Sequence, residues 1–186
     1  MNVVALIATV PWFVPGLIVT VIVSTIACRP VARWLGTSPM RAWWLVAGLG
    51  LIGVTTLTPQ REALAYGMVG TGTCDFSRVW PASLRFYAGN NDSAENIALF
   101  IPLGAAIALL PARIRPAALV AGIFLPIAIE AFQRQVTVLN RSCQSADVVD
   151  NLLGLGLGLA LGAALAAVPM LVKGIRRGYQ TRSSTR

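Results

Sequence analysis

Five apolar stretches alternate with polar segments along this chain. They run over Val3–Cys28, Ala42–Thr58, Ala94–Leu110, Ala117–Phe132 and Val148–Val172. An α-helix rises about 1.5 Å per residue, so roughly 20 residues cross the hydrocarbon core of a bilayer. The two end stretches are long enough, whereas the middle three need flanking residues or tilt. The pattern predicts an all-α fold, a polytopic bundle of five transmembrane helices.

The segments between these stretches alternate in charge. Three of them are basic and hold no acid; their charged residues are Arg29, Arg33 and Arg41, then Arg113 and Arg115, then Lys173, Arg176, Arg177, Arg182 and Arg186. The acids all fall on the other side of the membrane: Glu62, Asp75, Asp92, Glu95, Glu130, Asp147 and Asp150. Short basic loops stay in the cytoplasm. The charge pattern therefore predicts an outside N-terminus, a cytoplasmic C-terminus and acids at the outer face.

Composition narrows the class of protein further. The chain has 186 residues, 56% of them hydrophobic, and a formal net charge of +8. Residues 1–172 are expected to form one integral membrane domain, and residues 173–186 a mobile basic tail on the inner leaflet. In a soluble protein this charge would suggest nucleic acid, but here most of it lies beside the membrane. We therefore expect lipid as a partner and no nucleic acid; the oligomeric state stays open.

The three cysteines divide between the two predicted compartments. Cys28 lies at the cytoplasmic end of the first stretch, where thiols stay reduced. Cys74 and Cys143 both lie in loops predicted to be outside. A bond between them would close a loop of about 70 residues and contribute roughly 4 kcal/mol in the chain-entropy model. The alternative is two unrelated thiols. The charge pattern, which does not depend on the cysteines, puts both of them on the outer side and so favours a Cys74–Cys143 disulfide.

Polar residues gather near the outer ends of the last three stretches. They are Asn96, Glu130, Gln133, Arg134, Arg141, Asp147, Asp150 and Asn151. Single members have simpler explanations: Glu130 and Arg134 have the spacing of a surface ion pair, and acids are favoured in the first turn of a helix. Convergence of so many from three helices at one depth is instead typical of a functional site.

The last stretch carries a row of glycines below its polar residues. Its pattern is Asp147-x3-Asn151-x2-Gly154-x3-Gly158-x3-Gly162. At 100° per residue these positions share an arc of about 80°. Small residues at this spacing let two membrane helices approach closely. We expect Gly154, Gly158 and Gly162 to pack against another helix and so turn Asp147 and Asn151 into the bundle.

Taken together, these motifs resemble the VanZ-like family of small bacterial membrane proteins. The resemblance is carried by Asn96-x3-Phe100-x-Pro102-x-Gly104, Glu130-x2-Gln133, and Arg141-x5-Asp147-x3-Asn151-x2-Gly154, within a core region at 92–162. Arg141-Ser142-Cys143 resembles an actinobacterial type with an outer cysteine. The resemblance implies a multi-pass protein of the bacterial cell membrane and low-level resistance to glycopeptides of the teicoplanin type. Asp150 stands where many members have an apolar residue, so either Asp147 or Asp150 can be the important acid.

Two functions fit a cluster of Asn96, Glu130, Gln133, Arg141, Asp147 and Asn151. In the first, a non-enzymatic envelope protein binds a lipid-linked cell-wall component or the lipid-tailed drug. Arg141 would contact the anion, because a guanidinium matches phosphate geometry. The three amides would orient the ligand, and the two carboxylates would hold Arg141 or Arg134. We favour this function because it needs no activated nucleophile, and we assign no catalytic residue.

The second function is an intramembrane enzyme that acts on phospholipid or polyprenyl-phosphate headgroups. Glu130 and Asp147 would serve as acid and base or hold Mg²⁺. The chain has no histidine and no phosphate-loop motif, which argues against this chemistry and against a zinc site. We therefore predict no metal and no cofactor. A transporter is a third possibility, although five helices without a repeat are few for that role.

Overall fold

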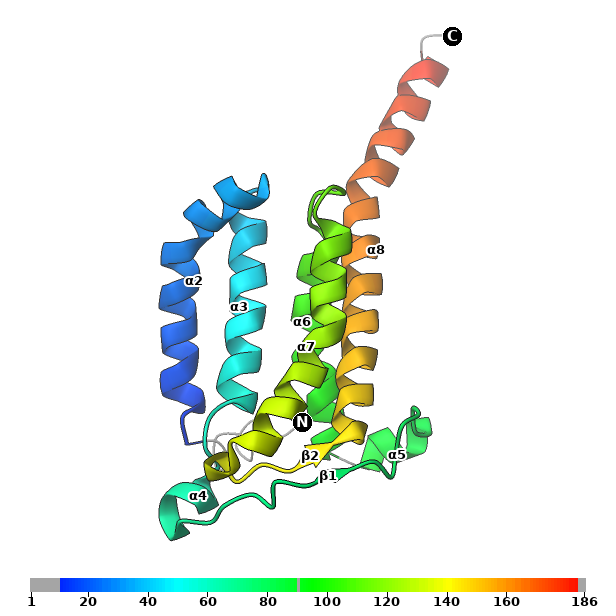
Figure 1. Ribbon diagram of the computed structural model, residues 1–186. Helices are drawn as coiled ribbons and strands as arrows, with labels where there is room; N and C mark the ends of the chain where they lie inside the picture. Colours follow the sequence, from blue (N-terminus) through cyan, green and yellow to red (C-terminus); the bar gives the residue numbers. More distant parts are fainter. Residues whose placement is uncertain (1–10, 90, 184–186) are drawn as a thin grey trace.

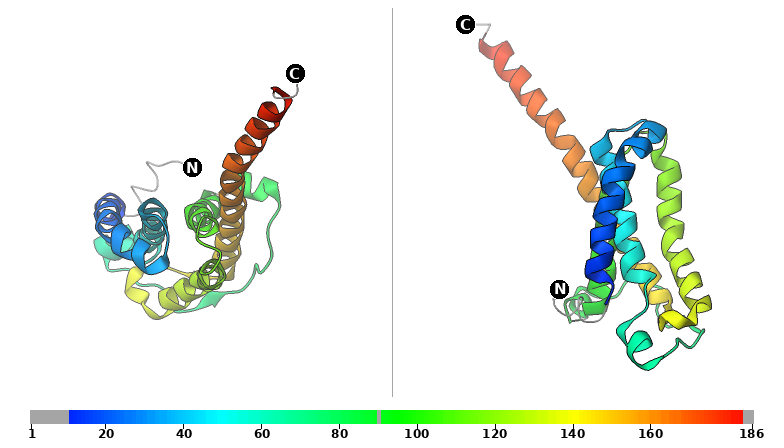
Figure 2. Two further views of the ribbon diagram at one scale, coloured as in Figure 1. Left: turned by 90° about the horizontal axis from the view of Figure 1, so that it is seen from above. Right: turned by 90° about the vertical axis from the view of Figure 1, so that its left-hand side faces the viewer.

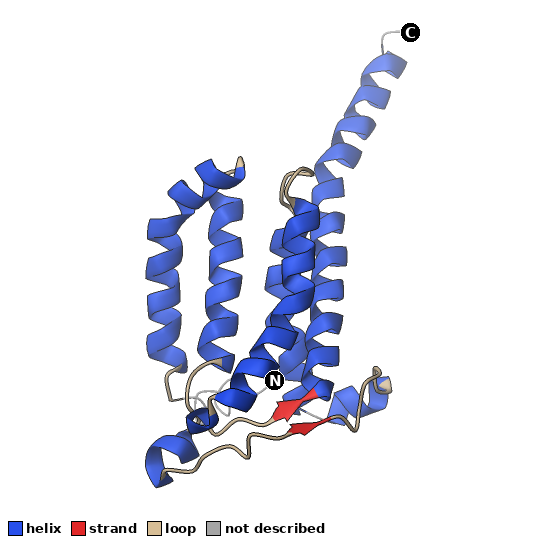
Figure 3. Cartoon of the chain, in the orientation of Figure 1, coloured by secondary structure: helices blue, strands red, loops and turns tan. Residues whose placement is uncertain are grey.

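The protein is mainly helical in a computed structural model that describes residues 11–89 and 91–183. Two very short strands and a one-turn 3-10 helix at Thr137–Leu139 join its helices (Figures 1 and 3). The helices in the described part of the chain are α2 (Phe13–Leu35), α3 (Pro39–Thr56), α4 (Arg61–Tyr66), α5 (Leu84–Gly89), α6 (Asn91–Ala108), α7 (Arg115–Gln135) and α8 (Ser145–Ser183). The predicted helical fold class is thus confirmed.

Three helices within the described residues are long and apolar enough to cross a membrane. They are α2, α7 and the Ser145–Ala167 part of α8. The helices α3 and α6 have 18 residues each and correspond to two of the three stretches predicted to be short. The structure therefore supports a helical membrane protein, while the number of five spans stays a prediction.

The ends of the first and last helices differ from the sequence prediction. The first was expected over Val3–Cys28, but α2 begins at Phe13 and ends at Leu35; residues 3–10 lie outside the described residues. Gly36 ends α2 in the left-handed conformation, with φ 62°, which glycine adopts without steric cost. Arg29 and Arg33 therefore lie in the helix rather than in a loop.

The last helix continues well beyond its predicted end at Val172. Its backbone is helical through Ser183, in the segment predicted to be a mobile tail, and residues 184–186 lie outside the described residues. The sequence after Pro169 contains no further proline to end a helix. The predicted contact of this segment with the inner leaflet stays untested.

The most extensive helix pair is α6 with α8. A Cβ added at Gly154 or Gly158 would collide with the carbonyl oxygen of Ile97 or Ile101 in α6, and one at Gly162 would come within 2.6 Å of the Ala105 carbonyl oxygen. The glycine row therefore faces α6, as expected. It lets the two backbones approach closely and fixes the rotation of α8 about its axis.

A second unit of the bundle is the hairpin of α2 and α3. The helix α3 contacts α6, whereas α7 packs on α8, so α6 and α8 are central (Figures 1 and 2). The buried core lies between α3, α6, α7 and α8 and is formed by Ile52, Phe100, Leu103, Ile107, Ile129 and Leu155. This arrangement leaves the starts of α6 and α8 and the ends of α3 and α7 at one end of the bundle.

The two longest connections meet at that same end. Strand β1 (Cys74–Asp75) pairs in parallel with β2 (Cys143–Gln144), and Cys74 lies opposite Cys143 (Figure 3). The predicted disulfide joins these two residues, with 4.5 Å between their Cα atoms. Short helices α4 and α5 lie at this end as well (Figure 1). The structure therefore gathers the acids and the disulfide at one end of the bundle, which we call the acidic end.

Candidate functional site

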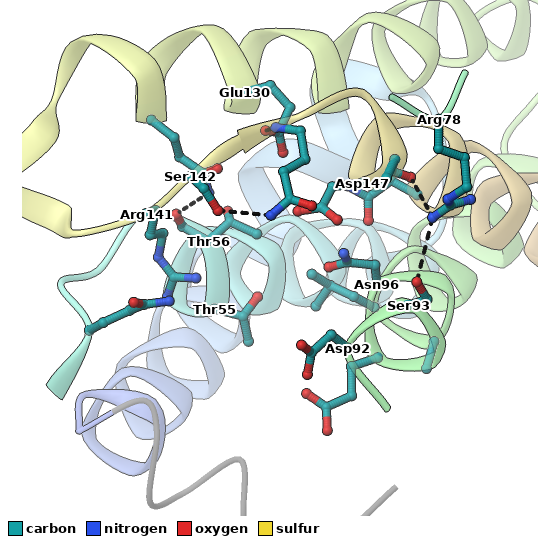
Figure 4. Close-up of a pocket in the computed structure, with 18 of the residues that line it drawn as sticks. Thr55, Thr56, Arg78, Asp92, Ser93, Asn96, Glu130, Arg141, Ser142 and Asp147 are labelled. Atoms are coloured by element: carbon teal, nitrogen blue, oxygen red, sulfur yellow. Dashed lines mark hydrogen bonds between the residues drawn. The ribbon is translucent and has the colours of Figure 1, made fainter. Parts of the chain in front are cut away.

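A pocket of about 860 Å³ opens at the acidic end, between α3, α6, α7 and α8. The loop around Arg78 and the Asn140–Gln144 connection complete its wall (Figure 4). All six residues of the candidate cluster line it: Asn96, Glu130, Gln133, Arg141, Asp147 and Asn151. Residues that are distant in sequence therefore meet in one polar cavity.

Arg141 enters the pocket from the connection between α7 and β2. Its Nε donates a hydrogen bond to the carbonyl oxygen of Thr58, 3.1 Å away. Its Nη2 is buried and has no hydrogen-bond partner in the part of the chain that the structure describes. Burial lowers the pKa of Arg141, and the nearby charges of Asp147 and Glu130 act in the opposite direction. A guanidinium stays protonated in proteins, so Arg141 brings a positive charge with an unused donor into the pocket.

The two carboxylates of the cluster lie near each other but form no ion pair with Arg141. Glu130 is 6% exposed, and its carboxylate accepts a 2.7 Å hydrogen bond from the backbone N–H of Gln144. Asp147 lies beside the side chain of Asn96 (Figure 4). Both carboxylates interact electrostatically with Arg141 and with each other. They compensate its charge from a distance and leave its donor free.

The alternative of a surface pair between Glu130 and Arg134 is wrong. Arg134 is exposed and does not line the pocket, whereas Glu130 is buried. Among the described residues, the one ion pair joins Arg78 to Asp150 instead. A spacing of four residues is compatible with a pair along one helix. In the structure, however, Glu130 lies on the buried face of α7, whereas Arg134 is exposed.

The amides of the cluster have different roles. Gln133 donates from Nε2 to the carbonyl oxygen of Thr56, 2.9 Å away, and so ties the end of α3 to α7. Asn151 is 2% exposed, and its Oδ1 has no partner. A buried polar atom without a partner is costly unless a water or a ligand satisfies it. Asn151 and Arg141 therefore both present unused hydrogen-bonding groups.

The sequence prediction missed Arg78 as the partner of Asp150 at the acidic end. Asp150 is fully buried and accepts hydrogen bonds from Arg78 Nη2 at 2.6 Å, Arg78 Nη1 at 2.9 Å and the Tyr87 hydroxyl at 3.0 Å. The hydrogen bond with Asp150 raises the pKa of Arg78, against an opposing effect of burial. Ser145 adds a 2.8 Å hydrogen bond to the carbonyl oxygen of Arg78.

These contacts separate the two acids that the sequence left equivalent. Asp147 lines the pocket, whereas Asp150 points to the loop and is saturated by Arg78 and Tyr87. One sequence signal could have found Arg78. If Cys74 pairs with Cys143 and the two segments run in parallel, the residue four positions after Cys74 lies beside the start of the last helix.

A metal centre finds little support at this site. In the ranges 11–89 and 91–183, no three histidine, cysteine or carboxylate side chains gather where they could hold one ion. The candidate cluster instead consists of one cation, two carboxylates and three amides, and Arg78, Glu62, Asp92 and Glu95 also line the pocket. Such a set can bind an anionic group that also donates or accepts hydrogen bonds.

The fold and the pocket define a helical membrane protein with a polar cavity at one end of its bundle. The family described as VanZ/LLP1 matches residues 17–166. This protein belongs to the VanZ/LLP1 family, and that membership links it to glycopeptide resistance. No curated protein and no solved structure matches the chain.

Proposed function

We propose that the pocket binds the anionic headgroup of a lipid-linked cell-wall component, or a lipid-tailed glycopeptide, at the outer leaflet. The buried Nη2 of Arg141, which has no hydrogen-bond partner among the described residues, carries this proposal. A guanidinium whose Nε is bonded to the Thr58 carbonyl oxygen is held in place and offers its remaining donors to phosphate or carboxylate oxygens. Binding would alter access of the drug to its target and give tolerance.

The walls of the pocket suit an amphiphilic ligand. Its polar groups come from α3, α6, α7, α8 and the Asn140–Gln144 connection, and Phe13, Leu51 and Leu99 add apolar surface. A lining with both polar and apolar groups supports a lipid-tailed ligand over a small water-soluble anion.

The proposal includes five spans with an outside N-terminus and a cytoplasmic C-terminus. A helix of 18 residues, such as α3 or α6, is about 27 Å long, close to the thickness of the hydrocarbon core. The acids and the disulfide share one end, and disulfides persist in oxidising compartments. Basic Arg113 and Arg115 lie at the opposite end, as the charge rule for cytoplasmic loops requires.

The orientation is tested with single thiols in a Cys28→Ser background. An impermeant maleimide should label Thr71→Cys in intact cells, because Thr71 lies in the exposed loop at the acidic end. Arg113→Cys, in the exposed loop at the other end, should react only after the cells are permeabilised. The reverse pattern would place the pocket on the cytoplasmic side and rule out an outer-leaflet ligand.

The function is tested by drug susceptibility in a sensitive bacterium that expresses the protein. Wild type should raise tolerance to teicoplanin more than to vancomycin, and Arg141→Gln or Asp147→Asn should abolish the effect at equal membrane level. Arg134→Gln is the matched control, because it removes a guanidinium from the same region outside the pocket. Equal loss in all three variants, or full tolerance in Arg141→Gln, would contradict the proposed site.

An enzyme that acts on the same headgroup is the second candidate. The observation that favours it is that two carboxylates, Glu130 and Asp147, line one pocket and interact electrostatically. Purified protein incubated with a polyprenyl phosphate would then release phosphate, and Glu130→Gln would stop the release while leaving binding intact. Binding without turnover in wild type supports the non-enzymatic function.

A further inference from the structure

The extramembrane segment around Arg78 exposes large apolar side chains in an unusual proportion. Within a stretch of nine residues, Phe76, Val79, Trp80 and Leu84 are between 55% and 88% exposed. We call these four residues the apolar face of the 76–84 segment. Isolated exposed apolar residues are common on proteins, but a group of large ones marks an interaction surface.

The polar groups of this segment point the other way, into the protein. Arg78 is turned toward Asp150, and the Tyr87 hydroxyl accepts a hydrogen bond from the backbone N–H of Ala82 at 3.0 Å while it donates to Asp150. The guanidinium of Arg78 also lies 5.5 Å from the ring centroid of Phe86. The segment is therefore anchored through its polar side, and this fixes its apolar face outward.

Figure 1 shows where the backbone of this part of the chain lies. Helix α5, which begins at Leu84, is beside the start of α8 and outside the group of long helices. Further along α8, Leu157, Leu161 and Leu165 are exposed on a helix that is long and apolar enough to span the bilayer. The apolar face is thus placed at the edge of a surface that faces lipid.

We propose that the apolar face of the 76–84 segment inserts into the headgroup and acyl boundary of the adjacent leaflet. Tryptophan and arginine side chains are typical of this layer, and exposed Arg85 next to Leu84 supplies a cation for lipid phosphates. Charge and continuity with the spans favour lipid over a second copy of the chain as the partner. The segment then couples the wall of the pocket, through Arg78, to the membrane surface. This inference is independent of what the pocket binds.

The experiment measures the depth of a spin label at single positions. Cys28→Ser removes the free thiol, and the Cys74–Cys143 disulfide is kept. A nitroxide is attached at Leu84→Cys or Trp80→Cys in vesicles of phosphatidylethanolamine and phosphatidylglycerol. Thr71→Cys is the matched control, because Thr71 is exposed in the same loop, in the part that crosses the end of the bundle between α4 and β1 (Figure 1).

The measured quantity is the ratio of the nitroxide's collision rate with dissolved oxygen to its collision rate with a water-soluble nickel chelate. If the face is inserted, this ratio should be severalfold higher at positions 80 and 84 than at position 71. Equal access of the nickel chelate at all three positions would overturn the proposal, because the face would then lie in water. Protection of positions 80 and 84 from both reagents would also overturn it and would identify a protein contact. None of these outcomes depends on drug tolerance, so failure here is separate from failure of the proposed function.

Discussion

Two of the arginines at the acidic end, Arg78 and Arg141, are held in opposite ways. Arg78 forms an ion pair with the fully buried Asp150 and contacts Tyr87 as well. Arg141 is bonded only to the carbonyl oxygen of Thr58, and its Nη2 is buried without a partner. We call Arg78 closed, because its charge is paired with Asp150 and it needs no ligand. We call Arg141 open, because its charge is balanced only at a distance. We therefore propose a structural role for Arg78 and a binding role for Arg141.

The largest effect expected from this comparison is on stability. Asp150→Asn leaves the Arg78 charge without its partner, which should cost about 3–5 kcal/mol of unfolding free energy, as for other broken buried pairs. Asp147→Asn is the matched change one turn away, and it should cost less than about 1 kcal/mol because Asp147 has no ion pair to lose. Thermal unfolding in detergent compares the two. Equal destabilisation by Asp150→Asn and Asp147→Asn would contradict the distinction between the closed Arg78 and the open Arg141.

A double-mutant cycle sharpens the same comparison. Arg78→Met with Asp150→Leu removes both charges and fills their volume with apolar atoms. The double variant should recover most of the stability that either single variant loses, with a coupling free energy of roughly 2–3 kcal/mol. Additive losses in the melting curves would mean that the ion pair contributes little and that the surrounding contacts hold the loop.

The smallest stability effect is expected at Arg141. Arg141→Gln loses one hydrogen bond to Thr58 but relieves a buried and unpaired charge, so the free energy of unfolding should change by about 1 kcal/mol or less. Drug tolerance should nevertheless be lost. A variant that unfolds as readily as Asp150→Asn would instead make Arg141 a structural residue.

The sequence was sufficient for the approximate positions of the five long helices and for much of the pocket. Hydrophobic length located the apolar helices, and the glycine row predicted which face of α8 turns inward. The spacing of polar residues on α6, α7 and α8 was enough to place Asn96, Glu130 and Asp147 together. These features repeat along a helix, so periodicity reveals them.

The contacts of the long loop could not be predicted in the same way. Arg78 has no periodic pattern around it, and its partner Asp150 lies 72 residues away. Whether a loop arginine is buried depends on the acid that it meets, and the neighbouring sequence does not reveal that acid. The hydrogen bond from the backbone N–H of Gln144 to Glu130 could not be predicted either, because every residue except proline has a backbone N–H. Such contacts follow from tertiary structure alone.

The central claim is that Arg141 binds an anion on a lipid tail. The most direct measurement is the shift in melting temperature of purified protein when farnesyl phosphate is added, with farnesol as the uncharged control. Because a ligand that binds the folded state stabilises it, farnesyl phosphate should raise the melting temperature of wild type and Arg134→Gln but not of Arg141→Gln, and farnesol should raise none. An equal shift in Arg141→Gln, or an equal shift with farnesol, would contradict the claim.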